Sequence, residues 1–222
     1  MPETISKVDA ARRQIDTAID LYFDDSDALS SYTLAYAGLK VLLDIYPHHQ
    51  GDGFDTQIDD LLGKEGWRHL SGIGNFLKHA DRDPTGVLET FDPESAYMVL
   101  GLATLLFRRI TGEFSRKMQA LDYWTELNAA DALGIPEMDG NPDRAAACKQ
   151  IIDNMNAAPR HVRMAFARTQ YQYFLANVER LEAEVEAAQQ SGRPLQEILD
   201  QAFSGPLWEQ FKQIKASERI KN

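Results

Sequence analysis

The sequence predicts an all-α protein, an antiparallel helical bundle with additional C-terminal helices. Apolar residues recur at spacings of three and four along most of the 222-residue chain, which is the period of an amphipathic helix. Runs of strictly alternating apolar and polar residues, which mark strands, are nearly absent. Residues that cap or break helices separate the periodic segments.

The first part of the chain is expected to form helices over residues 4–24, 28–46, 56–62 and 67–83. An acidic run, Asp24-Asp25-Ser26-Asp27, ends the first helix and provides the N-cap of the second. Pro47 is expected to stop the second helix. That helix carries many small residues over 30–38, so another helix can approach it closely.

Asp92-Pro93-Glu94 is typical of a helix start, with an N-cap, a proline at the first helical position and an acid in the first turn. It opens the most apolar helix of the chain, which should end near Gly112 and occupy the centre of the bundle. A further helix is expected over residues 113–133.

Residues 136–142 are the best candidate for a boundary between a bundle, residues 1–135, and a C-terminal helical extension packed on it, residues 136–222. One continuous domain is also compatible with the sequence. The extension is expected to contain helices over 143–157 and 160–190, followed by two short amphipathic helices around Ser204-Gly205-Pro206.

Apolar residues in the helix expected over 160–190 alternate by three and four, at Met164, Ala167, Tyr171, Phe174, Val178, Leu181, Val185 and Ala188. This helix could lie along the bundle or pair with another copy of itself. Aromatic residues in the pattern suit irregular packing better than a dimeric zipper, so the first arrangement is favoured.

Composition limits the classes of function. The net charge of −11 argues against general attraction to a nucleic-acid backbone, so any such site would be a local basic patch. The single cysteine, Cys148, cannot form an internal disulfide, and the N-terminus lacks the pattern of a secretory signal. The longest apolar run, residues 96–107, is shorter than the about 20 residues that span a bilayer. We therefore expect a cytoplasmic protein without membrane association.

The helix expected over 67–83 is the part of the chain best suited to chemistry. Arg68, Asn75 and His79 fall on one face at 100° per residue, with Arg82 close by. The opposite face is apolar and suits burial, with Trp67, Leu70, Ile73, Leu77 and Ala80.

Two interpretations of His79 follow. In the first it is an ordinary residue near a helix C-terminus, where the dipole favours it, and Asn75 is a polar residue satisfied by a neighbouring helix. In the second His79 is a general acid/base, because imidazole exchanges a proton near neutral pH, and Asn75 orients it or a substrate phosphate.

Gly74-Asn75-Phe76-Leu77-Lys78-His79 resembles a degenerate form of the signature of the HEPN superfamily (higher eukaryotes and prokaryotes nucleotide-binding). In that family an Arg, often followed by a polar Asn, precedes a His on one bundle helix, with four to six residues between them. The resemblance implies nucleotide or RNA binding, metal-independent ribonuclease activity in the catalytic members, and a homodimer that pairs two sites. Asn75 and His79 match the polar and His positions and would be the catalytic pair. Gly74 stands where the family has Arg, so ribonuclease activity is expected to be impaired or absent.

Basic side chains near this motif, Arg68, Lys78 and Arg82, are the candidates for substrate binding. No cofactor or metal site is predicted, because the sequence has neither a Glu-x-x-His pair nor two His at i, i+4 nor a Gly-rich phosphate loop. The nearest approach to a metal cluster is His48-His49 beside Asp52 and Asp55.

A second basic region, Arg160-His161-Arg163, could bind nucleotide or RNA, or dock an acidic segment of a second subunit. Ordinary solvated helix faces explain the same charges and are favoured.

Two functions therefore stand side by side. The first is a HEPN-like nucleotide- or RNA-binding protein with its site at Asn75 and His79. The alternative is a non-catalytic helical module for dimerisation or protein interaction.

Overall fold

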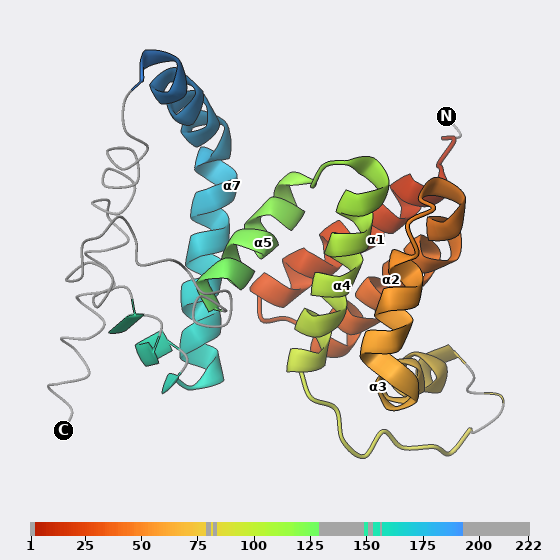
Figure 1. Cartoon of the computed structure of the whole chain (residues 1–222). Helices are drawn as coiled ribbons and strands as arrows, with labels where there is room; N and C mark the ends of the chain where they lie inside the picture. Colours follow the sequence, from red (N-terminus) through yellow and green to blue (C-terminus); the bar gives the residue numbers. More distant parts are fainter. Residues whose placement is uncertain are drawn as a thin grey trace, which may run out of the picture. The chain divides into compact units, whose positions relative to one another are not determined.

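The computed structural model describes residues 3–78, 81, 84–128, 149–150, 153–155 and 157–192. Within these ranges the secondary structure is helical, without strands, which confirms the all-α class (Figure 1). The helices are α1 (Lys7–Phe23), α2 (Ala28–His49), α3 (Phe54–Lys78), α4 (Glu94–Thr111), α5 (Arg116–Asn128) and α7 (Arg160–Ser191). None of the described helices is both long and apolar enough to cross a bilayer.

The chain divides into two compact units, Met1–Leu175 and Ala176–Asn222. The expected boundary at 136–142 and the expected C-terminal helices lie outside the described residues, as does most of the helix expected over 143–157. The division at residue 135 therefore stays a prediction.

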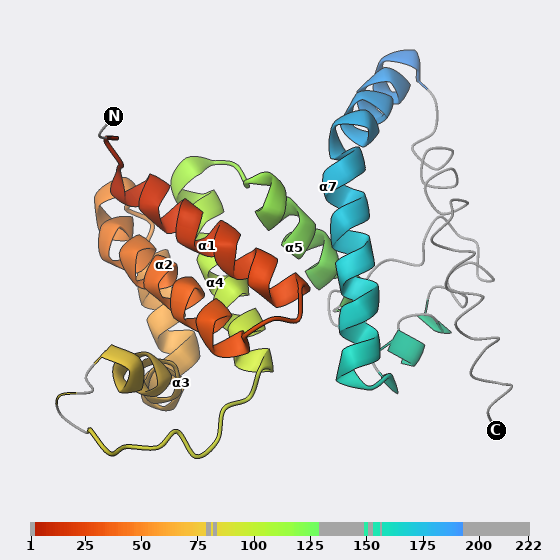
Figure 2. The same cartoon turned by 180° about the vertical axis from the view of Figure 1, so that it is seen from behind.

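A core formed by α1, α2 and α4 holds the first unit together (Figures 1 and 2). α4 supplies five fully buried side chains to it, as expected for the central helix: Ala96, Val99, Leu100, Ala103 and Leu106. The start of α4 also agrees with its sequence, because the Asp92 carboxylate accepts the Glu94 N–H at 2.9 Å. Its end is Gly112, at φ 83°, where glycine is the favoured residue.

The small residues of α2 do permit a close helix contact. A Cβ at Gly38 would lie 2.8 Å from Cγ1 of Ile15, so α1 passes directly over this glycine. About two turns earlier on α2, the Ser31 hydroxyl donates to the Ala18 carbonyl of α1 at 2.8 Å. The predicted N-cap is confirmed as well, since the Asp27 carboxylate accepts the Ser30 N–H at 3.1 Å.

The predicted end of α2 at Pro47 is wrong. The helix includes Pro47 and continues to His49. A proline removes one backbone N–H donor from the helix. Close to the C-terminus of the helix, the N–H groups after the proline can still donate to carbonyls one turn earlier. The Gln50 N–H donates to the Tyr46 carbonyl at 2.9 Å and closes the last turn.

The two helices expected around residues 56–83 are the two halves of α3, joined at one residue. Gly63 interrupts the helix with φ 56° and ψ −172°. This region of backbone conformation is open to glycine and strained for any residue with a side chain. α5 begins at Arg116, later than the predicted residue 113, because the Ser115 hydroxyl caps it by accepting the Met118 N–H at 3.2 Å.

The first half of α7 belongs to the first unit and follows the favoured arrangement along the bundle. Met164 and Ala167 are fully buried in its core, and Tyr171 stacks on Phe23 of α1 with ring centroids 4.4 Å apart. The Tyr171 hydroxyl donates to Asp20 at 2.6 Å, so this side of α7 is fixed by packing and by a hydrogen bond.

Candidate functional site

Three of the predicted site residues, Arg68, Asn75 and Lys78, lie exposed on the second half of α3. Arg68 forms an ion pair with Glu65, one turn earlier on the same helix. His79 and Arg82 lie outside the described residues. The catalytic assignment of Asn75 and His79 therefore stays a prediction.

Gly74, at the position of the family's Arg, is where α3 meets α2. A Cβ at this residue would lie 2.5 Å from Cε1 and 2.7 Å from Cδ1 of Tyr36, far inside van der Waals contact. Tyr36 is itself buried and stacks on Tyr32, with ring centroids 6.0 Å apart. The packing thus excludes a side chain at residue 74, and an arginine would need the Tyr36 ring to move.

Two tyrosines of α2 hold this part of α3 in place. The Tyr32 hydroxyl donates to the Leu70 carbonyl at 2.8 Å, and Lys78 Nζ lies 5.5 Å from the centre of the Tyr36 ring. Burial raises the pKa of both Tyr32 and Tyr36, so both phenols stay protonated at neutral pH.

The face predicted to be buried is only partly so. Leu70 and Ile73 lie in the core, as expected. Trp67 is half-buried, because it forms the wall of a groove, and the side chains of Leu77 and Ala80 are outside the described set.

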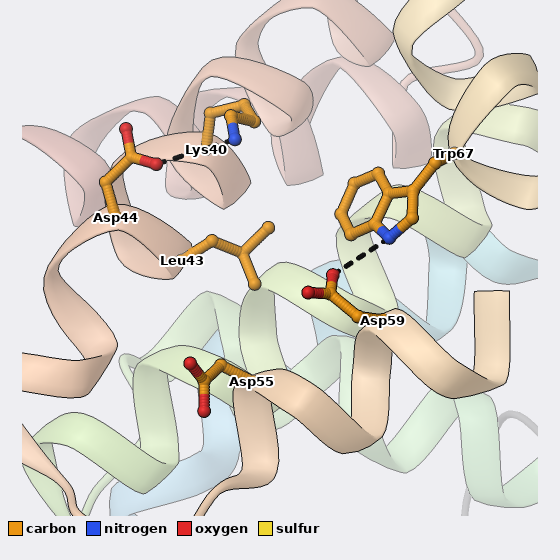
Figure 3. Close-up of a pocket in the computed structure, with 6 residues that line it drawn as sticks. All are labelled: Lys40, Leu43, Asp44, Asp55, Asp59 and Trp67. Atoms are coloured by element: carbon orange, nitrogen blue, oxygen red, sulfur yellow. Dashed lines mark hydrogen bonds and ion pairs between the residues drawn. The ribbon is translucent and has the colours of Figure 1, made fainter. Parts of the chain in front are cut away.

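The groove lies between α2 and α3 and has a volume of about 360 Å³ (Figure 3). Lys40, Leu43 and Asp44 line it from α2, and Asp55, Asp59 and Trp67 from α3. The Trp67 indole N–H donates to Asp59 at 2.9 Å, which fixes the plane of the ring. Lys40 pairs with Asp44 at 3.5 Å.

Charge in this groove is negative, with three carboxylates and one ammonium group among its lining residues. An indole face beside carboxylates is a favourable environment for a cation, since the ring and the acids both attract positive charge. The same field repels phosphate.

Sequence reasoning did not identify the groove. Asp55 and Asp59 are spaced i, i+4, as are Lys40 and Asp44, so each pair is visible as one helix face. Their convergence depends on how α2 and α3 pack, for which the sequence has no local signal.

The second basic region, on α7, is neutralised within the chain. Arg160 pairs with Asp25, Arg163 pairs with Glu94 at 2.7 Å, and Arg168 pairs with Asp24 at 3.5 Å. These arginines attach α7 to the α1–α2 loop and to the start of α4. They are therefore committed to intramolecular contacts.

One of the two acids near His48 and His49, Asp52, is also engaged in structural contacts. Asp52 accepts a hydrogen bond from the Tyr46 hydroxyl at 2.9 Å and forms an ion pair with Arg109. Arg109 lies over the Phe54 ring, 3.9 Å from its centre. Among the residues that the structure describes, no three His, Cys, Asp or Glu side chains gather as a metal site would require.

Comparison of the chain with protein-family models, with curated proteins and with solved structures finds no match.

Proposed function

We propose that this chain is a helical protein-interaction module that binds a basic segment of a partner protein in the groove between α2 and α3. The observation that carries the proposal is the concave, acidic, Trp-walled surface itself. A lysine or arginine side chain fits its chemistry, because the charged head meets Asp55 and Asp59 while the aliphatic stem lies along Trp67 and Leu43.

Two further observations support an interaction module. The protein is strongly acidic as a whole, so its field attracts a basic segment at long range. The Lys40–Asp44 ion pair at the groove is exposed, with the Asp44 side chain 71% accessible, so a partner's cation can replace Lys40 at little cost.

The experiment is titration of the protein with an unstructured peptide rich in lysine and arginine, followed by calorimetry. We expect weak binding that decreases as salt is added, because exposed charge pairs are screened. Asp55→Asn and Asp59→Asn should each weaken binding about two- to fivefold. Asp60→Asn is the matched control, since Asp60 is an exposed acid of the same helix that does not line the groove. Equal affinities for all three variants would contradict the proposal.

A HEPN-like nucleotide- or RNA-binding protein is the second candidate. Its support is that Asn75 and Lys78 are both accessible on the same end of α3. Residue 74 has no room for the arginine of the HEPN signature, and the groove beside this helix is acidic. Both observations favour the interaction module over the HEPN-like candidate.

A further inference from the structure

The Trp67 ring is held in one orientation at the wall of the groove between α2 and α3. Its indole N–H donates to Oδ1 of Asp59 at 2.9 Å, across the glycine that separates the two halves of α3. The Trp67 side chain is half-buried, so part of the ring stays open to the groove (Figure 3). The free protein therefore presents a flat ring with a carboxylate fixed beside it.

The carboxylates beside the ring have acceptor capacity left for a ligand. Asp59 uses Oδ1 for the Trp67 N–H, and its second oxygen has lone pairs of its own. Asp55, one turn earlier, is half-buried, and none of the described residues forms an ion pair with it. Figure 3 shows both side chains below Leu43 and Trp67, on the same side of the groove. A half-buried carboxylate without a cation attracts one strongly.

The chain itself combines a ring, a carboxylate and an arginine immediately before Asp55. Arg109 of α4 lies over the Phe54 ring, with its guanidinium carbon 3.9 Å from the ring centre, and it pairs with the Asp52 carboxylate. At this distance the guanidinium stacks on the face of the ring while its N–H groups reach the acid. The groove presents the same two components, a ring and carboxylates, without the arginine.

The lysines near α3 lie differently. Lys40 lines the same groove, and its ammonium group pairs with Asp44 of its own helix at 3.5 Å. Lys78 Nζ is 5.5 Å from the centre of the Tyr36 ring, further than Arg109 is from its ring. An ammonium group is compact and strongly hydrated, whereas a guanidinium is planar and weakly hydrated, so it stacks on a ring and bonds within its own plane. The open, ring-walled groove therefore suits the guanidinium better.

We propose that the groove selects arginine over lysine in the basic segment that it binds, and that Trp67 is the residue that sets this preference. The inference rests on the proposed function and names the side chain that the groove takes. The guanidinium of the partner's arginine stacks on the indole face, and its N–H groups donate to Asp55 and to the second oxygen of Asp59. The aliphatic stem of the arginine lies along Leu43.

Two unstructured peptides of identical sequence, one with arginine and one with lysine at every basic position, test the proposal by calorimetry. Wild type should bind the arginine peptide about two- to fivefold more tightly, as expected for a cation–π contact at an exposed site. The ratio should stay constant as salt is added, although both affinities fall, because the two peptides carry the same charge. Equal affinities would overturn the arginine preference and leave the proposed function intact, whereas no binding of either peptide would remove both.

Variants of the ring test the role of Trp67. Trp67→Leu should bring the two affinities together by weakening the arginine peptide, and Trp67→Phe should keep part of the preference, because phenylalanine retains a smaller ring. Phe76→Leu is the matched control and should keep the full preference, since Phe76 is a 37% exposed ring of the same helix that does not line the groove. Circular dichroism establishes that each variant is folded. A folded Trp67→Leu variant with the preference of wild type would overturn the proposal.

Discussion

Gly74 allows α3 to pack closely on α2, because the Tyr36 ring occupies the space in which a side chain at residue 74 would lie. Tyr36 has little freedom to yield, since it is 6% exposed and stacked on Tyr32. Overpacking of this kind costs free energy because neighbours must leave their preferred rotamers or the helix must shift.

Gly74→Ala should therefore lower the free energy of unfolding by about 1–3 kcal/mol. Gly72→Ala, two residues earlier on the same helix, should raise it by about 0.5–1 kcal/mol, because alanine favours helix and Gly72 has nothing within 4 Å of its Cβ direction. Urea unfolding of both variants gives the comparison. Equal effects of the two substitutions would show that Tyr36 does not constrain residue 74.

Between elements, the contact of the α2–α3 loop with α4 depends on pH. Asp52 of the loop bonds to Tyr46 of α2 and pairs with Arg109 of α4, and the Gln50 side chain donates to the Arg109 carbonyl at 2.8 Å. The hydrogen bond from Arg109 lowers the pKa of Asp52 below that of an ordinary aspartate. The contact therefore stabilises the fold as long as Asp52 is ionised.

A lowered pKa in the folded state means that this stabilisation is present above the unfolded pKa, near 4, and is lost as the pH falls through the lower folded value. Asp52→Asn should be less stable than wild type at pH 7, and the difference should shrink towards pH 2. Thermal unfolding at several pH values measures it. Asp60→Asn, which removes an exposed acid outside this contact, is the control. A difference between Asp52→Asn and wild type that stays constant with pH would contradict the role of the Asp52 charge.

Most elements of the fold could be predicted, because helices are encoded locally by period and by capping residues. Asp27, Asp92 and Gly112 all mark helix ends as expected. Pro47 misled the prediction because its effect depends on its place in the last turn, where losing one donor costs little. The candidate site was harder to predict from the sequence. Exposure of Asn75 follows from helical period, whereas the clash at Gly74 and the groove at Trp67 arise from residues about 25 to 40 positions away in α2.

For the whole molecule, charge is the property that bears most on its partners. The net charge is −11, and the arginines of α7 that could have formed a basic surface are paired with Asp24, Asp25 and Glu94. Affinity for nucleic acid depends on unpaired basic groups that displace counterions. This distribution of charge supports the proposed basic protein partner over RNA.

Wild type should accordingly bind single-stranded RNA weakly and should not cleave it in the presence of a chelator. His79→Ala should then leave both the weak RNA binding and the lack of cleavage unchanged. If wild type does cleave, and His79→Ala lowers the rate by about 10²–10⁴-fold with the fold intact, His79 is a general acid/base and the HEPN-like candidate holds. A gel-based cleavage assay with circular dichroism of the variant separates these outcomes.

Gly63 has a consequence for the groove although it does not line it. Asp55 and Asp59 precede this glycine and Trp67 follows it, so the width between them is governed by two backbone angles at one residue. The Trp67–Asp59 hydrogen bond connects the two halves of α3 across Gly63 and so fixes the angle between them. A ligand that takes over the Asp59 carboxylate would release that bond and free this angle to change. The groove could thus adjust its width to its occupant, with a glycine as its pivot.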